Sequence, residues 1–157
     1  MEKRDEISKE LISRLRELNP APVALIEGNG GIWGNWGRNI PVVHIYEEPT
    51  EEEIVKRGMY QIVLPIRIEY ILRLNDKSQI YTEGRAKLKQ LSTVIEQDER
   101  FFSRWVDKEL VIDYYRTTSE IADIMDGVLG VGVIYNFIYA EKFKGYEQNR
   151  PHFPRKP

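Results

Sequence analysis

The chain lacks cysteine and has little histidine, and each shortage excludes a class of functional site. None of its 157 residues is a cysteine, so it has no disulfide framework, no thiolate zinc site and no cysteine nucleophile. Its two histidines, His44 and His152, cannot complete a histidine-rich metal site by themselves. We therefore expect neither a metal nor a cofactor.

The chain also has neither a large excess of one sign of charge nor a long apolar run. There are 25 acidic and 23 basic residues, giving a formal net charge of -2, which does not favour binding of nucleic acid through bulk electrostatics. No apolar run approaches the roughly 18 residues of a membrane span, and the opening residues MEKRDEISKE contain no apolar signal core. The sequence therefore predicts a soluble, intracellular protein without a membrane partner.

Two segments have the residue spacing of amphipathic helices. Apolar residues recur at helical spacing over residues 5–18, and Asn19-Pro20 ends the pattern because a residue before proline is pushed out of the α region. Residues 78–100 form the second predicted helix, which we expect to pack against the sheet. Its apolar stripe consists of Ile80, Gly84, Leu88, Leu91, Val94, Ile95 and Phe102.

Strict alternation of apolar and polar residues predicts strands, two of them long. Residues 59–74 are apolar at every even position, which would make a strand about 50 Å long. Such a strand is expected to project as an arm or hairpin toward another subunit, and Pro65, which has no ladder donor, to mark an edge or a bend. Residues 128–143 are apolar on both faces and predict a central or covered long strand.

Shorter patterns complete the expected fold. The sequence predicts strands at residues 41–47 and 108–116 and a turn at Asp126-Gly127. It also predicts a short helix that is capped by Thr118-Ser119-Glu120 and runs through Met125. The predicted class is α+β, with an antiparallel or mixed sheet of about four strands and two main helices on one face. Residues 1–143 would form a single domain, and residues 144–157, with three prolines and four bases, a flexible tail.

A glycine-rich segment, residues 27–38, invites comparison with phosphate-binding loops. It contains five glycines and two tryptophans, and this glycine density predicts a loop. The dinucleotide-binding pattern starting at Gly28 would need a glycine where Trp33 stands, and no helix start or GK[ST] motif follows. Without a local core for their rings, Trp33 and Trp36 are expected either to fold back onto the domain or to dock on a partner.

Catalytic patterns are missing from the rest of the chain. His44 lies mid-strand without a serine or carboxylate at triad spacing, which favours a structural role. The acidic turn at residues 47–53 lacks the alternating ligands of a calcium loop, and core or interface use of the nine tyrosines is favoured over an RNA-stacking platform. We therefore expect a protein that is not an enzyme.

Charged and aromatic residues in these segments are the candidates for a partner interface. The second helix carries its bases early and Glu96, Asp98 and Glu99 late, which the helix dipole disfavours. Either simple solvation or a complementary neighbour would account for that order. The full candidate set is Trp33, Trp36, Arg38, Glu51, Glu52, Arg85, Lys87, Lys89, Arg150 and Arg155.

The order of these elements resembles the tail-terminator, or tail-completion, family of long-tailed bacteriophages. The resemblance covers residues 5–143 and rests on EISKELISRLREL with its proline stop, PVVHIYEEP, GMYQIVLPIRIEYILRL, the second helix and VLGVGVIYNFIYAEKF. It implies a virion protein, assembled in the host cytoplasm, that forms a homo-oligomeric ring, commonly a hexamer. The ring would contact the tail tube protein and the head connector protein, and nucleic acid only as the genome passes through.

Three other functions stay open at this stage. Another phage head-tail connector or neck protein of similar size would show the same pattern. A small nucleic-acid-binding module is supported only by the strand tyrosines and the basic tail, and a small hydrolase or cofactor enzyme comes third.

Overall fold

The computed structural model describes residues 2–27, 40–48, 51–56, 59–96, 111–125 and 127–142. They form two α-helices, α1 (Lys3–Leu15) and α2 (Ile80–Glu96), with the short 3-10 helix η1 (Lys77–Gln79) directly before α2. The strands are β1 (Ala24–Glu27), β2 (Val42–Glu47), β3 (Glu51–Lys56), β4 (Met59–Arg73), β5 (Asp113–Met125) and β6 (Val128–Lys142).

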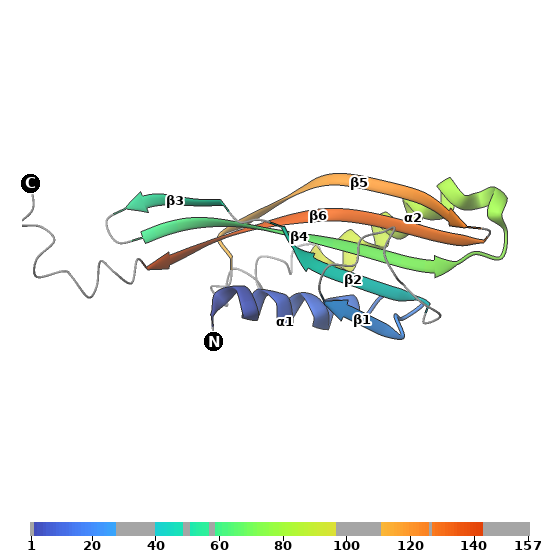
Figure 1. The fold of residues 1–157 in the computed structure, drawn as a ribbon, viewed down its shortest axis with the longest axis horizontal. Coiled ribbons are helices and arrows are strands. Elements are labelled where there is room, and N and C mark those ends of the chain that lie inside the picture. Colours follow the sequence, from blue (N-terminus) through green and yellow to red (C-terminus); the bar gives the residue numbers. More distant parts are fainter. Residues whose placement is uncertain are drawn as a thin grey trace, which may run out of the picture.

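The strands form one mixed sheet, which confirms the predicted α+β class (Figure 1). The strand order is β1-β2-β4-β6-β5, and β3 pairs with β4 beside this path. Only β1 and β2 are parallel; every other described pair is antiparallel. The sheet has six strands where about four were expected, because β1 and β3 are short edge strands without an alternating pattern. Neither described helix is long and apolar enough to cross a membrane.

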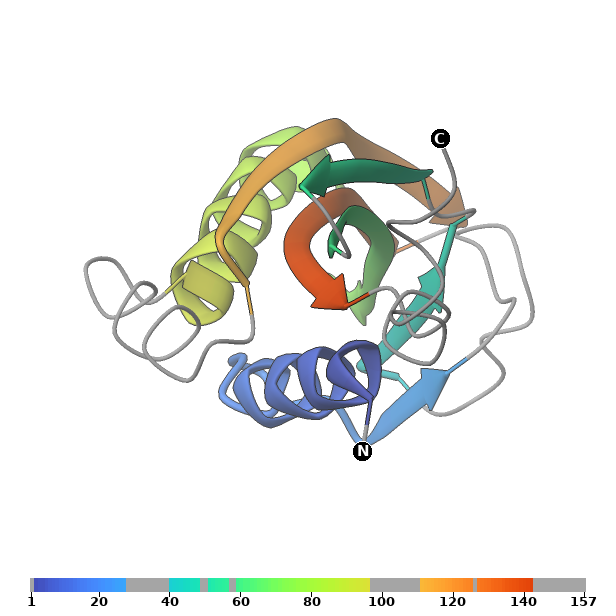
Figure 2. The same ribbon diagram turned by 90° about the vertical axis from the view of Figure 1, so that its left-hand side faces the viewer.

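Both helices pack on the same face of the sheet, as predicted (Figure 2). The buried stripe of α1 includes Ile7, Leu11 and Leu15, and that of α2 includes Leu91 and Ile95. They meet the even-numbered residues of β4 and the odd-numbered residues of β6, which lie opposite one another in the register. This contact forms the main hydrophobic core.

The long strand β4 has two partners in succession on one flank, which explains Pro65. β2 pairs with β4 as far as Glu47 opposite Ile66, and β3 resumes with Glu51 opposite Val63. Pro65 falls between these two ladders, where a missing donor costs little, and its carbonyl accepts from the amide of Glu48 at 2.8 Å. β2 and β3 thus form one interrupted long hairpin with β4.

An arm extends from the body, as the length of β4 led us to expect. It consists of β3, the first residues of β4 and the last residues of β6, and Figure 1 shows these ends reaching beyond α1. The side chain of Lys3 in α1 donates to the carbonyl of Ala140 at 3.2 Å, and Arg4 pairs with Glu47 at 3.3 Å. These contacts join the N-terminal end of α1 to the root of the arm.

The predicted short helix at residues 118–125 is wrong. β5 continues as a strand through this stretch and pairs with β6 from Asp113 to Met125. The predicted strand at residues 108–116 is therefore shifted, since β5 begins at Asp113; residues 108–110 lie outside the described residues. Pairing with β6 overrides the local helix signal, and a bulge at Thr118, whose φ is 50°, accommodates the extra residue. The predicted turn is confirmed by Gly127, whose φ of 74° suits glycine.

Candidate interaction surfaces

The predicted interface residues fall into three groups. Glu51 and Glu52 lie on β3, so the segment predicted as an acidic turn is in part an edge strand. The three bases of the second helix lie on α2. Outside the described residues lie Trp33, Trp36, Arg38, Arg150 and Arg155.

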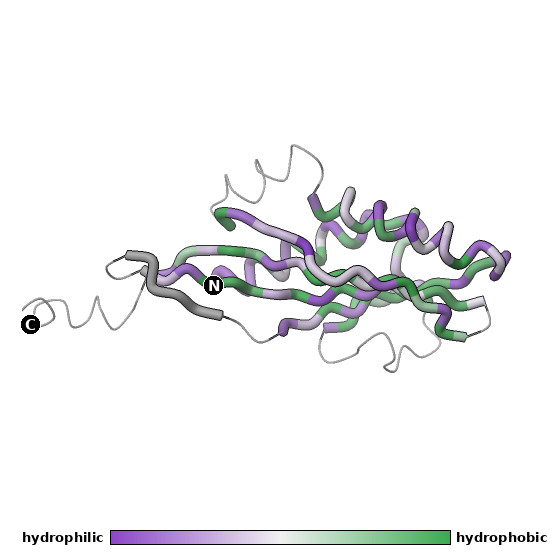
Figure 3. Tube along the Cα trace, turned by 90° about the horizontal axis from the view of Figure 1, so that it is seen from above, coloured by the Kyte–Doolittle hydropathy of each residue, from purple (hydrophilic) through white to green (hydrophobic). Residues whose placement is uncertain are grey.

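The bases on α2 do not act as one group. Arg85 and Lys89 are exposed, whereas the half-buried Lys87 donates from Nζ to the carbonyl of Asn19 at 3.0 Å. Lys87 thereby anchors the middle of α2 to the segment that follows α1. Figure 3 shows hydrophilic and hydrophobic residues alternating along α2, as expected for a helix with one solvent-facing side.

An open groove of about 340 Å³ lies beside Lys87, between η1, the start of α2 and the end of β4. Its charged side chains are Arg73 and Lys87 on one hand and Asp76 and Glu83 on the other. The Tyr70 hydroxyl donates to the carbonyl of Pro20, which also lines the groove. Because the two signs balance, the groove has no preference for an ionic ligand of one sign.

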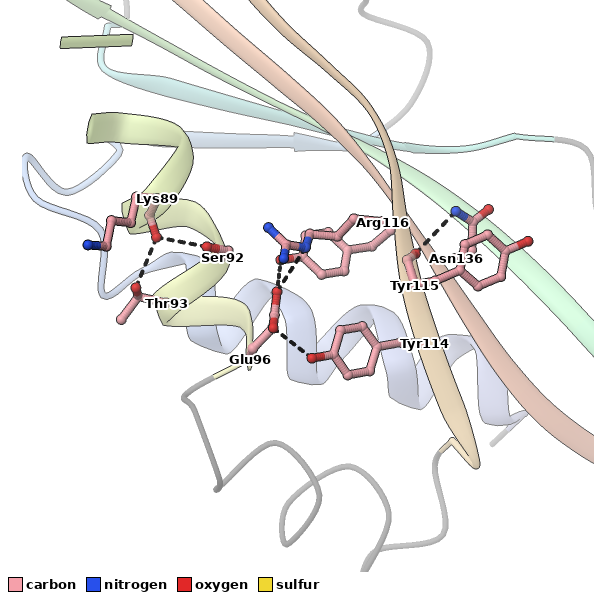
Figure 4. Close-up of polar contacts among 9 residues, drawn as sticks. Lys89, Ser92, Thr93, Glu96, Tyr114, Tyr115, Arg116 and Asn136 are labelled. Atoms are coloured by element: carbon pink, nitrogen blue, oxygen red, sulfur yellow. Dashed lines mark hydrogen bonds and ion pairs between the residues drawn. The ribbon is translucent and has the colours of Figure 1, made fainter. Parts of the chain in front are cut away.

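The unfavourable acid at the end of α2 is neutralised within the chain. The carboxylate of Glu96 accepts from the hydroxyls of Tyr114 and Tyr135, each at 2.6 Å, and Arg116 lies 3.3 Å away (Figure 4). Burial, followed by the hydrogen bond to Glu96, raises the pKa of Tyr114 to about 12 and raises that of Tyr135 further. The unfavourable interaction of Glu96 with the helix dipole is therefore offset by side chains of the same chain rather than by a neighbouring protein.

A row of polar side chains crosses the other face of the sheet, which neither described helix covers and which is called the helix-free face below. In the register His44 of β2 lies opposite Glu69 of β4, Glu69 lies opposite Gly132 of β6, and Gly132 lies opposite Glu120 of β5. Arg67, two residues from Glu69 on the same face of β4, reaches across β6 to the acid on β5. Its Nε donates to Glu69 at 2.8 Å and its Nη2 to Glu120 at 3.0 Å.

Burial determines the electrostatics of this row. His44 and Glu69 are fully buried, and His44 Nδ1 is 3.9 Å from Glu69 Oε1, too far for a hydrogen bond. Burial alone would lower the pKa of Arg67, but its hydrogen bonds to Glu69 and Glu120 outweigh that effect and raise it. Burial also raises the pKa of Tyr46, with a smaller contribution from the charge of Glu69.

The sequence analysis did not identify this row, apart from interpreting His44 as structural. The one signal was the presence of Arg67 and Glu69 at the polar positions of the long alternating strand. Within the described part of the chain, no group of three or more His, Asp or Glu side chains is placed to hold a metal ion. The arrangement is an internal ion pair that ties β4 to β5 across β6.

The two ends of the sheet are different edge strands, and both carry exposed apolar side chains. At the β1 edge, Val23, just before the strand, is 66% exposed, and Ile26, within the strand, is 38% exposed. At the β5 edge, Ile112, just before the strand, and Tyr115 and Met125, within it, are each about half exposed. Three strand tyrosines that could have stacked on RNA bases, Tyr70, Tyr135 and Tyr139, are instead buried in the core.

Two comparisons with known proteins found no match. A scan against models of protein families found none that matches the chain. A search of curated proteins found no match either.

Proposed function

We propose that this protein is a non-enzymatic, ring-forming structural protein of a phage virion, a tail terminator that caps the tail tube and joins it to the head connector. The observation that carries the proposal is a sheet with two different edges, β1 and β5, and exposed apolar side chains at both. An edge strand offers unpaired backbone groups to a second chain, and apolar side chains beside it add contact area.

Two unlike edges favour a ring over a simple dimer. When one edge of a protomer binds the opposite edge of the next, the contact is heterologous, and repeated contacts of this kind close into a ring or grow into a filament. β1 and β5 lie at opposite ends of the strand order, which suits a chain of such contacts (Figure 1). The resemblance to tail terminators favours closure, commonly with six copies.

The arm supports contact with a further partner. It extends beyond the helices, so it could reach a tube or connector subunit while the body of the sheet contacts its neighbours in the ring (Figure 1). Arg85 and Lys89, which are exposed on α2, would be available for the same purpose. The mechanism requires no chemical step, because each completed ring presents a surface that its separate subunits lack.

Mass in solution combined with edge variants tests the ring. Six copies of the 18.5-kDa chain would weigh about 111 kDa, measurable by analytical ultracentrifugation and visible as rings by electron microscopy. Val23→Lys at β1 and Tyr115→Lys at β5 should each reduce assembly, because each places a charge beside an edge. Tyr81→Lys is the matched control, since Tyr81 is 61% exposed and belongs to α2, not to either edge strand.

Binding to tail tubes tests the specific role. The protein should co-sediment with purified tubes and stop their growth, including when it is monomeric in free solution. Failure to bind tubes would exclude the terminator role, whereas rings without tube binding would point to another connector or neck protein. Salt-sensitive binding to RNA or DNA would favour the nucleic-acid-binding alternative.

A further inference from the structure

We infer that the acidic edge strand β3 is a docking surface for the basic C-terminal tail, residues 144–157, of the same chain. Among the described strands β3 pairs only with β4, so its other edge has no strand partner there. It lies on a projecting arm, where an uncovered edge is a template for unwanted pairing with other chains. Proteins commonly cover such an edge with another segment.

The charges of the two segments are complementary. Residues 47–53 contain five glutamates and no base, whereas residues 144–157 contain four bases and one acid. One basic side chain already pairs with this acidic segment: Arg4 of α1 forms an ion pair with Glu47 at the end of β2. Several opposite charges brought together in this way attract more strongly than one exposed pair, and salt should weaken the attraction.

The tail follows β6, and the end of β6 lies close enough to β3 for the tail to reach that strand. Lys142, the last residue of β6, lies opposite Met59, and Met59 lies opposite Lys56 at the end of β3. From β6 to β3 is two strand spacings, roughly 10 Å, and from Lys56 back to Glu52 is roughly 13 Å along the strand. Arg150 follows Lys142 by eight residues, a reach of roughly 26 Å, so no second copy is needed.

The prolines of the tail suit a covering segment rather than a new strand. Pro151, Pro154 and Pro157 have no backbone N–H and cannot continue a ladder. A segment with this composition covers β3 without presenting a fresh edge of its own. In a free protomer the tail would keep the arm from pairing nonspecifically, and a partner binding β3 would have to displace it.

Spin-label distances in the full-length chain test this contact. Because the chain has no cysteine, Lys56→Cys and Gln148→Cys give two unique labelling sites, one on β3 and one in the tail. At low salt we expect one short separation in most molecules, which broadens in high salt. The separation should persist when labelled protein is diluted with excess unlabelled protein, because the contact is within one chain.

Charge variants decide whether the attraction is ionic and specific. Arg150→Glu with Arg155→Glu should broaden the distances without touching the sheet, and adding Glu51→Lys with Glu52→Lys should restore them. Arg85→Glu with Lys89→Glu makes the same change of net charge on α2 and should leave the distances unaltered. A broad distribution in the unmodified chain, loss of the short distance on dilution or no restoration by the swap would overturn the inference.

These outcomes are separate from those of the ring proposal. The contact is measured within single chains, so it can hold for a protein that never assembles. Rings or tube binding can likewise form in a protein whose tail does not dock.

Discussion

The two faces of the sheet are both buried in places, but they are filled with different chemistry. On the helix-covered face, β4 contributes Leu64, Ile66, Ile68 and Tyr70 to an apolar core. On the helix-free face, the same strand contributes Arg67 and the fully buried Glu69. This face also holds a second, smaller apolar cluster of Val42, Ile71 and Val128, so β4 carries the main hydrophobic core on one side and an ion-pair network beside a minor core on the other.

The difference separates two ways of stabilising a sheet. Apolar packing has no required direction and tolerates small shifts, whereas a buried carboxylate is stable only while its partners hold their geometry. The bonds from Arg67 to Glu69 and Glu120 therefore fix how β4 and β5 line up across β6, and a one-residue slip would separate these side chains. The helix-covered face holds the larger apolar core, and the ion pairs of the opposite face specify the register of β4 and β5.

The largest expected effect comes from a cavity in the covered face. Leu64→Ala should lower the free energy of unfolding by about 2–5 kcal/mol, because Leu64 is fully buried and its removal leaves a void in the core. Val63→Ala is the matched control, being the preceding residue on the opposite face and only half-buried. Urea unfolding measures both, and an equal loss from the two would contradict the contrast between the faces.

A smaller but still large effect is expected at the buried ion pair. Glu69→Gln should cost about 1.5–3 kcal/mol, since Arg67 loses its buried carboxylate. Glu120→Gln removes the other carboxylate of the same guanidinium, but its side chain is 39% exposed, so the loss should be below about 1 kcal/mol. If the two variants unfold at the same urea concentration, burial does not distinguish these partners.

The elements of the fold were not equally predictable from the sequence. The period of the apolar residues predicted both helices and the strands β2, β4 and β6 within a few residues, because each buries at least one regular apolar face. β1 and β3 were missed because ALIE is too short for a pattern and EEEIVK is mostly charged. Their structure comes from backbone pairing with a neighbour, which leaves no apolar period.

The polar clusters were beyond sequence reasoning for a related reason. Glu69 and Glu120 share Arg67 only because β4 and β5 both pair with β6 in one register. Gly132 of β6 lies between the two acids in that register, a position that no local motif reveals. Glu96 looked like a misplaced charge because its partners, Tyr114 and Tyr135, come from a later part of the chain.

At the rim of the covered face, a pH effect should be seen at Tyr114. Its pKa is about 12 in the folded chain, against an ordinary value of 10.0, so folding favours the protonated phenol. That stabilisation is complete below about pH 10 and is lost as the pH rises toward 12. Tyr114→Phe should cost about 1 kcal/mol at neutral pH by removing a hydrogen bond to Glu96, and should flatten the fall in stability between these pH values.

Urea unfolding across that pH range, with tyrosinate absorbance followed in parallel, measures both effects. Tyr81→Phe is the control, because Tyr81 is exposed on α2 and belongs to neither face. An unchanged alkaline profile in Tyr114→Phe would show that Glu96 does not hold this phenol.

The smallest effect is expected outside both faces, on the exposed side of α2. Arg85→Ala and Lys89→Ala should each change the free energy of unfolding by less than about 0.5 kcal/mol, because both side chains are exposed. Lys87→Ala should cost somewhat more, since it removes the contact between Nζ and the carbonyl of Asn19. Urea unfolding ranks the three, and a loss above about 1 kcal/mol at Arg85 or Lys89 would mean that a third region helps to hold the fold. If stability is unchanged, any loss of ring assembly or tube binding in these two variants reflects a lost contact with a partner.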